Sequence, residues 1–336
     1  MLRMTVYCPA VPLTLREMRT STLLLVALVI PLAASSPRPD PPEIQEWPIP
    51  GAQFPLLPAV GPDGNVYVTI RFSDRIARFD PNTREFTQWD VGRGTQPHGL
   101  LLDANGLVWF TGSGNGTVGR LDPRTGKITT YRVAATAYPH TPVMDARGDL
   151  WFTQFQGNNI GRLDTATGKI REYPTKGQPY GIALDRSGGV WFTQFIGGKV
   201  ARLDPETGAI SELSVGDNAR PRRMALAPDG SLYAALYAAG KLVRIDPASR
   251  KIVRSYELPG GRDSNPYAVA ADSAGRVYAS ATGTNRILRL DPKSDEFEAI
   301  PLPGKHAMVR GLTIDRKGRL WYAASATGRI GVMERR

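Results

Sequence analysis

A four-residue motif, Gly-x-aliphatic-Trp/Tyr, recurs seven times along this chain and constrains its fold more than any other feature. Its aromatic residues are Tyr67, Trp109, Trp151, Trp191, Tyr233, Tyr278 and Trp321, separated by 42, 42, 40, 42, 45 and 43 residues. A near-constant period in this range is typical of one supersecondary unit that is copied and stacked, because a single unit cannot bury its own apolar face. The repeats run from about Glu43 to the C-terminus and predict one repeat domain.

Residues 97–132 show what each unit folds into. They contain four strand-like runs, at 99–103, 107–111, 117–122 and 127–132, and no helical periodicity of useful length. The turn sequences DANG (103–106) and DPRTG (122–126) follow the first and third runs. Four antiparallel strands repeated seven times predict an all-β fold, a seven-bladed β-propeller.

The two ends of the repeat region complement each other. The last repeat stops after its third strand, at 328–333, whereas residues 43–48 (EIQEWP) resemble fourth strands such as KIREYP at 169–174. We therefore expect the N-terminal strand to complete the last blade, which closes the ring and removes two open sheet edges. A ring closed in this way needs no partner subunit, so a monomer is expected.

The first 42 residues have the composition of a targeting region and a linker. Residues 18–20 (MRT) supply a short positive region, residues 23–34 (LLLVALVIPLAA) are apolar, and residues 33–35 are small, as in a cleaved signal peptide. We assign 1–35 to a signal peptide with an upstream extension at 1–17, 36–42 to a Pro/Ser-rich tether and 43–336 to the propeller. An uncleaved membrane anchor is the alternative, although the apolar run is short for a membrane span.

Cysteine usage and net charge indicate which compartment and which kinds of partner suit this chain. The single cysteine, Cys8, lies in the removable region, so the mature chain would carry no thiol and would suit a periplasmic or secreted location. The formal net charge is +11, with basic residues spread through the repeats. No recognition helix, aromatic RNA-binding motif or dense Lys/Arg run indicates a nucleic-acid partner. A basic exported protein suits anionic ligands or envelope polymers.

The link between blades leads directly into the innermost strand, on the face that we call the top. The second residue of each inner strand, eleven residues before the repeated aromatic, would be aliphatic if it served only the core. Only one of the seven is aliphatic. In chain order they are Leu56, His98, His140, Tyr180, Arg222, Tyr267 and Arg310. Two of the three histidines of the chain thus occupy one position in adjacent blades.

These side chains suit acid–base chemistry on a small-molecule or cyclic peptide ligand in the central channel. Imidazole accepts and returns a proton near neutral pH. Arg222 and Arg310 would hold a carboxylate or stabilise an oxyanion, and Tyr180 and Tyr267 would donate hydrogen bonds or stack on the ligand. In the alternative interpretation, all six polar residues plug the channel and bind backbone carbonyls.

Two similar loops of the top face extend the prediction. Gln154-Phe155 and Gln194-Phe195 would form a rim of amides and aromatic rings, or else the rings pack between blades while the amides point into water. His306, at no repeated position, is expected to be an exposed loop residue. No Asp/Glu/His group has compelling metal-ligand spacing, so the metal ligands are unknown.

The sequence resembles the virginiamycin B lyase (streptogramin lyase) family. The resemblance is carried by repeats such as PHTPVMDARGDLWFTQFQGNNIGRLDTATGKIREYP and PYGIALDRSGGVWFTQFIGGKVARLDPETGAISEL and covers nearly all of residues 43–333. It implies a seven-bladed propeller and an enzyme that opens a cyclic depsipeptide by elimination across the ester C–O bond, with Mg²⁺ assistance and without water. By position, His98 corresponds to the family's substrate-contacting histidine and His140 to its general base.

The chain departs from the family pattern in three respects. Tyr138 stands where the family carries a metal-binding Glu, and Gly112, Gln154 and Gln194 stand where it often has Glu. The histidine pair lies in the second and third blades, whereas the family pair lies in the last two. We expect altered or lost metal dependence. The expected substrate contacts are Tyr138, Gln154, Tyr180, Gln194, Arg222, Tyr267 and Arg310.

Three functions follow from this pattern. The first is an exported lyase-like enzyme that acts on an ester or lactone, with His140 as base and His98 as partner. The second is a non-catalytic periplasmic propeller that binds a peptide, glycan or envelope partner on the same face. The third is a lactone hydrolase, which the lack of a central carboxylate cluster disfavours.

Overall fold

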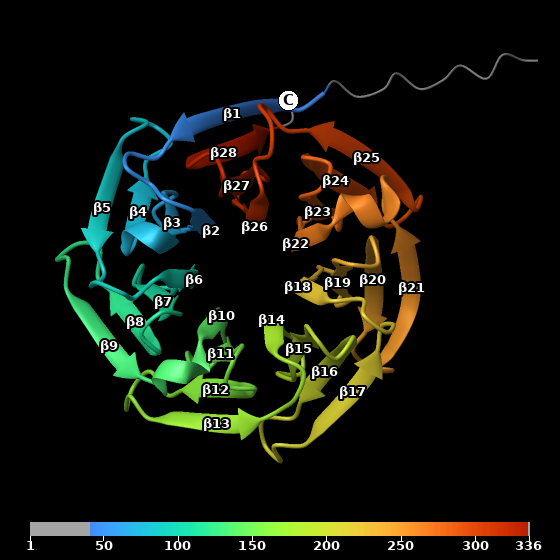
Figure 1. Cartoon of the computed structure of the whole chain (residues 1–336), viewed down its shortest axis with the longest axis horizontal. Helices are drawn as coiled ribbons and strands as arrows, with labels where there is room; N and C mark the ends of the chain where they lie inside the picture. Colours follow the sequence, from blue (N-terminus) through green and yellow to red (C-terminus); the bar gives the residue numbers. More distant parts are fainter. Residues whose placement is uncertain (1–40, 335–336) are drawn as a thin grey trace, which may run out of the picture. The chain divides into compact units, whose positions relative to one another are not determined.

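The computed structural model describes residues 41–334 as seven four-stranded antiparallel sheets. Figure 1 shows them as seven blades whose first strands face the centre of the ring. The predicted seven-bladed propeller is therefore confirmed. Within the described residues, the structure contains no helix with the length and apolar character that a membrane crossing requires. The predicted signal peptide and nearly all of the tether lie outside the described residues.

Each blade runs outward from an inner strand. The inner strands are β2 (Pro55–Val60), β6 (Pro97–Leu102), β10 (Pro139–Met144), β14 (Pro179–Leu184), β18 (Pro221–Leu226), β22 (Pro266–Ala271) and β26 (Val309–Ile314). The second strands are β3 (Val66–Ile70), β7 (Val108–Gly112), β11 (Leu150–Gln154), β15 (Val190–Gln194), β19 (Leu232–Leu236), β23 (Val277–Ala281) and β27 (Leu320–Ala324).

The outer half of each blade has the same plan. The third strands are β4 (Arg75–Phe79), β8 (Thr117–Leu121), β12 (Asn159–Leu163), β16 (Lys199–Leu203), β20 (Lys241–Asp246), β24 (Arg286–Asp291) and β28 (Arg329–Glu334). The outermost strands are β5 (Phe86–Asp90), β9 (Ile128–Arg132), β13 (Ile170–Pro174), β17 (Ile210–Ser214), β21 (Lys251–Glu257), β25 (Glu296–Pro301) and β1 (Glu43–Pro48). Single 3₁₀ turns lie at η1 (Arg71–Ser73), η2 (Ala135–Ala137) and η3 (Gly261–Ser264).

The N-terminal strand closes the ring as predicted. Strand β1 pairs antiparallel with β28, with Trp47 opposite Ile330. The Tyr322 hydroxyl donates a 2.8 Å hydrogen bond to Glu46, and the Trp47 ring lies 4.8 Å from the ring of Phe79 in the first blade. The closing strand therefore contacts both the last and the first blade.

The core lies between neighbouring blades. All five residues of every second strand are buried. The apolar clusters each combine two blades; one of them joins Tyr67 and Ile76 of the first blade to Val108, Phe110 and Leu121 of the second. Burying one blade's apolar face against the next is the interaction that the repeat period predicts.

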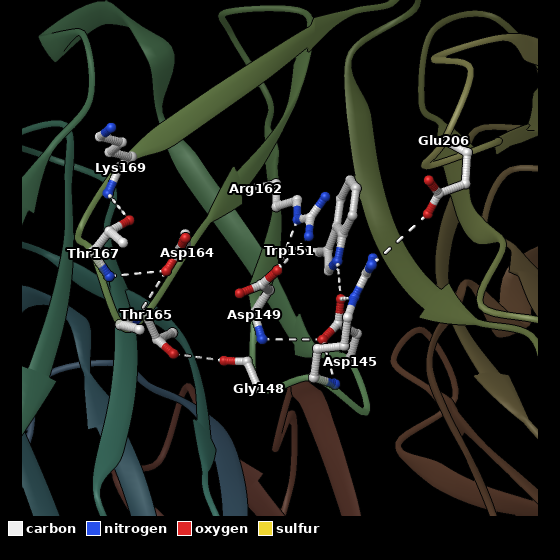
Figure 2. Close-up of polar contacts among 12 residues, drawn as sticks. Asp145, Gly148, Asp149, Trp151, Arg162, Asp164, Thr165, Thr167, Lys169 and Glu206 are labelled. Atoms are coloured by element: carbon white, nitrogen blue, oxygen red, sulfur yellow. Dashed lines mark hydrogen bonds and ion pairs between the residues drawn. The ribbon is translucent and has the colours of Figure 1, made fainter.

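The bottom-face turns fix the repeated aromatic residues. In the third blade, Asp145 accepts hydrogen bonds from the indole of Trp151 at 2.9 Å and the amide of Asp149 at 3.0 Å (Figure 2). Arg162, one of the repeated arginines, donates to the carboxylate of Asp149. Such arginines serve the architecture of the blade.

In the fifth blade Ala227 stands at the position of Asp145, and the aspartate of this turn, Asp229, accepts hydrogen bonds from Ser231 and Arg244 instead. The buried hydroxyl of Tyr233 has no hydrogen-bond partner among the described residues.

Candidate functional site

Every inner strand begins from a strained residue on the top face. The residue before each strand has a positive φ, between 45° and 64°, although none of the seven is glycine: Phe54, Gln96, Tyr138, Gln178, Arg220, Asn265 and Met308. Left-handed backbone is uncommon for such residues and often marks a functional site. The chain therefore turns sharply into the centre of the ring at one place in each blade.

A β-bulge follows each turn and brings two successive residues to the ring centre. In β10, Pro139 pairs with Gln154 and Pro142 pairs with Phe152, so His140 and Thr141 both lie opposite one residue of β11. A bulge of this kind re-aims side chains that strict alternation would send to opposite faces. The same shift occurs in all seven blades.

Hydroxyl groups hold the bulges in position. Thr153 accepts a hydrogen bond from the amide of Thr141 at 3.1 Å and donates one to the carbonyl of Tyr180 in the next blade at 2.9 Å. Thr111 makes the equivalent pair of bonds, from the amide of Gly99 and to the carbonyl of His140. Because each hydroxyl ties one blade to the next, the backbone of the mouth is preorganised.

The two predicted histidines lie against each other. The ring centroids of His98 and His140 are 3.8 Å apart with a 35° tilt, and their side chains are only 3% and 2% exposed. His140 Nδ1 shares a 2.8 Å hydrogen bond with Thr141 Oγ1. The Tyr180 ring lies 4.0 Å from His140, and its hydroxyl contacts that of Tyr267.

Burial and neighbouring cations keep both imidazoles neutral. Burial lowers the pKa of His98 well below 6.5, and the charges of Arg223, Arg71 and Arg310 lower it further. Burial also lowers the pKa of His140 well below 6.5, with smaller contributions from His98, Arg223 and Arg222. A neutral imidazole is available as a proton acceptor at neutral pH.

The tyrosine beside them stays protonated. Burial raises the pKa of Tyr180, and the neighbouring Tyr267 raises it further. Its hydroxyl therefore remains a hydrogen-bond donor at neutral pH.

Guanidinium groups packed on aromatic rings surround the histidine pair. The Arg222 guanidinium lies 4.3 Å to 4.9 Å from the centroids of four rings, those of Phe195, Tyr180, Tyr237 and Tyr267. Arg310 lies over Phe54 and Tyr267 in the same way. Cation–π contacts of this kind hold the planar groups in place.

Arg223 belongs to the site, and sequence reasoning missed it. It is 6% exposed; its Nε donates to the Arg310 carbonyl at 3.0 Å and its Nη1 to Thr141 Oγ1 at 3.2 Å. It thus reaches from the fifth blade to the third and the seventh. The sequence does contain a feature that could have identified it, because Arg223 occupies a position where the other blades carry small or aliphatic residues. These residues are Leu57, Gly99, Thr141, Gly181, Ala268 and Gly311.

The prediction that Gln154 and Gln194 contribute their amides to the rim is wrong. Gln154 and Gln194 are buried, and their amides donate to Glu172 and Glu212 on outer strands, at 2.7 Å and 2.8 Å. The carboxylate partners on β13 and β17 draw both side chains away from the ring centre.

The aromatic half of the rim does form. The ring of Phe155 lies 5.8 Å from that of Phe195 and 5.9 Å from that of His140. His306 is exposed, as expected.

The mouth does not fit the Mg²⁺ that the family resemblance implies. Tyr138, at the position of the family's metal-binding Glu, accepts a 2.5 Å hydrogen bond from Arg71. Mg²⁺ prefers carboxylate and other oxygen ligands, whereas the charged groups around the histidines are guanidiniums. Residues 41–334 contain no group of three or more His, Cys, Asp or Glu side chains arranged to hold a metal ion.

The fold and this site define a seven-bladed β-propeller with a neutral histidine pair beneath a cationic, aromatic mouth. The model of the virginiamycin B lyase family matches residues 40–177 and 85–336. The chain belongs to the virginiamycin B lyase family.

Solved structures agree with this assignment. A streptogramin B lyase is similar at 24% identity and a TM-score of 0.81, over 88% of this chain and 98% of that one. A catalytically inactive variant of virginiamycin B lyase from Staphylococcus aureus, solved with quinupristin, is similar at 26% identity and a TM-score of 0.81, over 87% and 99%.

More distant likeness extends beyond the family. Hydrazine synthase of Kuenenia stuttgartiensis shares the fold at 16% identity and a TM-score of 0.72, over 84% of this chain and 96% of that one. No curated protein sequence matches this chain.

Proposed function

We propose that the protein is a carbon–oxygen lyase that opens an ester or lactone by base-catalysed elimination. The observation that supports this most is the contact of two neutral imidazoles, His98 and His140, at the mouth of the ring. A general base must be unprotonated and held in a fixed position, and burial in a preorganised backbone supports both.

His140 is the proposed base. Its Nδ1–H donates to Thr141 Oγ1 in the tautomer that this role requires, which leaves Nε2 to accept a proton. The imidazole removes the proton α to a carbonyl, the resulting electron pair forms a C=C bond, and the β C–O bond breaks. The ester oxygen leaves as a carboxylate, and the proton on His140 passes to solvent. No water is consumed, and His98 contacts the substrate beside the base.

Cationic side chains would stabilise the enolate-like charge in place of a metal. Arg222 and Arg223 lie near His140 and contribute to its lowered pKa. The protonated hydroxyl of Tyr180, whose ring is 4.0 Å from His140, is a further donor. Fixed donors and cations in a water-poor site are an effective means of stabilising developing negative charge.

A streptogramin B depsipeptide is the first substrate to test, because a family enzyme 26% identical to this chain was solved with quinupristin. The mature protein is incubated with quinupristin in EDTA, and the product is analysed by mass spectrometry. Elimination gives a linear product of unchanged mass, whereas hydrolysis gives one heavier by a water molecule. His140→Leu and His98→Leu should abolish turnover, and His306→Asn should retain it.

Binding without chemistry is the second candidate function. It is favoured by Arg223 and the Tyr180–Tyr267 contact, which occupy the ring centre, so that a partner would bind above them on the top face. Absence of a linear product from quinupristin and from simpler esters, with ligand binding retained, would support this function and reject the lyase.

We further propose an exported, monomeric protein, on the strength of its N-terminal sequence and its self-closing ring. Cleavage near residue 35 and recovery from the periplasm or medium would support export. An intact N-terminus in the cytoplasmic fraction would reject it.

A further inference from the structure

The mouth concentrates positive charge without acidic partners. Arg71, Arg222, Arg223 and Arg310 all influence the histidine pair electrostatically. Within the described residues, none of these four arginines forms an ion pair with a carboxylate. Four of the six repeated arginines on the bottom face differ, since Arg162, Arg202 and Arg244 each pair with an aspartate and Arg289 pairs with Glu298.

Several donors at this place are buried and unused. Arg223 Nη2, Arg222 Nε and Arg310 Nε have no hydrogen-bond partner in the part of the chain that the structure describes. Arg223 is itself more than nine-tenths buried. A buried cation without a counter-charge is costly, and an unpaired buried donor adds to that cost. The arrangement therefore favours an anion that the chain does not supply.

The surroundings specify the kind of anion. Aromatic rings pack against the guanidinium of Arg222. The N–H groups of a guanidinium lie in its plane and point outward from its edges, where a planar carboxylate accepts two parallel hydrogen bonds. The half-buried rings of Phe54, Phe155 and Phe195 lie around these cations and offer apolar contact beside the charge. An inorganic anion could not use those rings.

We propose that Arg222, Arg223 and Arg310 form a binding site for an organic carboxylate that carries an aromatic or apolar group. The proposal rests on the proposed function in one respect: elimination from an ester releases a carboxylate, which this site would receive. The same site would also bind such a carboxylate in a protein that performs no chemistry.

Ligand-induced thermal stabilisation tests the site without turnover. The melting temperature of the mature protein is measured at one ionic strength in the presence of sodium phenylacetate, of its neutral analogue 2-phenylethanol, or of inorganic phosphate. We expect phenylacetate to raise the melting temperature saturably, by about 3 °C, because it binds the folded state. Neither of the other compounds should do so.

Variants assign the effect to the mouth. Arg223→Met and Arg222→Met should lose the response to phenylacetate, and Arg223→Lys should keep a weakened one. Arg132→Met, which changes an exposed arginine of β9, should respond like the wild type. Circular dichroism of each unliganded variant shows whether the propeller has formed; should Arg223→Met not fold, Arg223→Lys and Arg222→Met decide.

Three results would overturn the proposal: no saturable rise, an equal rise with phosphate, or a full response in Arg222→Met and Arg223→Lys. Phenylacetate binding without any elimination activity would reject only the proposed lyase. Elimination activity without phenylacetate binding would reject only the carboxylate site.

Discussion

Acidification should destabilise the protein through His98 and His140 specifically. Both imidazoles have a pKa well below 6.5 in the folded protein because they are buried. Well above pH 6.5 they are neutral in both the folded and the unfolded state and contribute no pH dependence. As the pH falls below 6.5, the unfolded chain binds protons that the folded chain excludes, so the free energy of unfolding decreases.

The size of the effect follows from the number of buried rings. Each histidine that stays neutral while its unfolded counterpart titrates costs about 1.4 kcal/mol per pH unit. Between pH 7.5 and pH 5.5 the pair therefore accounts for a loss of about 3 kcal/mol. This is a substantial part of the roughly 5–15 kcal/mol by which domains are stable.

Equilibrium urea denaturation at pH 7.5, 6.5 and 5.5 measures this loss. Leucine is the substitution of choice, because Leu56 holds the equivalent place in the first blade. His98→Leu and His140→Leu should each remove about half of this loss, and the double variant should remove it almost entirely. His306→Asn, at an exposed histidine, is the control and should keep the wild-type dependence. A double variant with an unchanged pH dependence would refute the reasoning.

Three further changes test the architecture and the metal assignment. Ala227→Asp should raise the free energy of unfolding by about 1 kcal/mol, since it restores the missing turn acceptor near the unpaired Tyr233 hydroxyl; a lower urea midpoint would contradict this. Tyr322→Phe should cost about 1–3 kcal/mol by removing the bond to Glu46, whereas Tyr131→Phe, whose hydroxyl makes no hydrogen bond in the described structure, should cost little in the same assay. Dialysis against EDTA should leave the melting temperature unchanged, because the mouth supplies cations where a metal needs carboxylates; a fall that Mg²⁺ reverses would contradict the metal-free assignment.

Most of the architecture can be predicted from the repeat period of the sequence. Seven aromatic residues at near-constant spacing, together with short strands and regular turns, predicted the blades, and the truncated last repeat predicted that residues 43–48 pair with the final strand. These features are local or periodic, so they can be read along the chain. The polar residues that open the inner strands were found for the same reason, because they break a repeated aliphatic position.

Contacts across the ring could not be predicted in this way. Arg223 follows Arg222 directly, and strict strand alternation would place one of the two away from the centre, but the bulge opposite Ala235 brings both inward. The Arg71–Tyr138 bond joins the first and third blades, far apart in the chain. Gln154 was misassigned because its partner, Glu172, lies two strands away on an outer strand.

The state of the two buried imidazoles is the most direct test of the account. NMR of protein labelled with ¹⁵N in its histidine rings, recorded across the pH range, reports the protonation of His98 and His140 separately. The account predicts that both rings remain neutral well below pH 6.5 and that their signals shift when phenylacetate is added. Protonation of either ring at or above pH 6.5, or signals indifferent to the ligand, would contradict it.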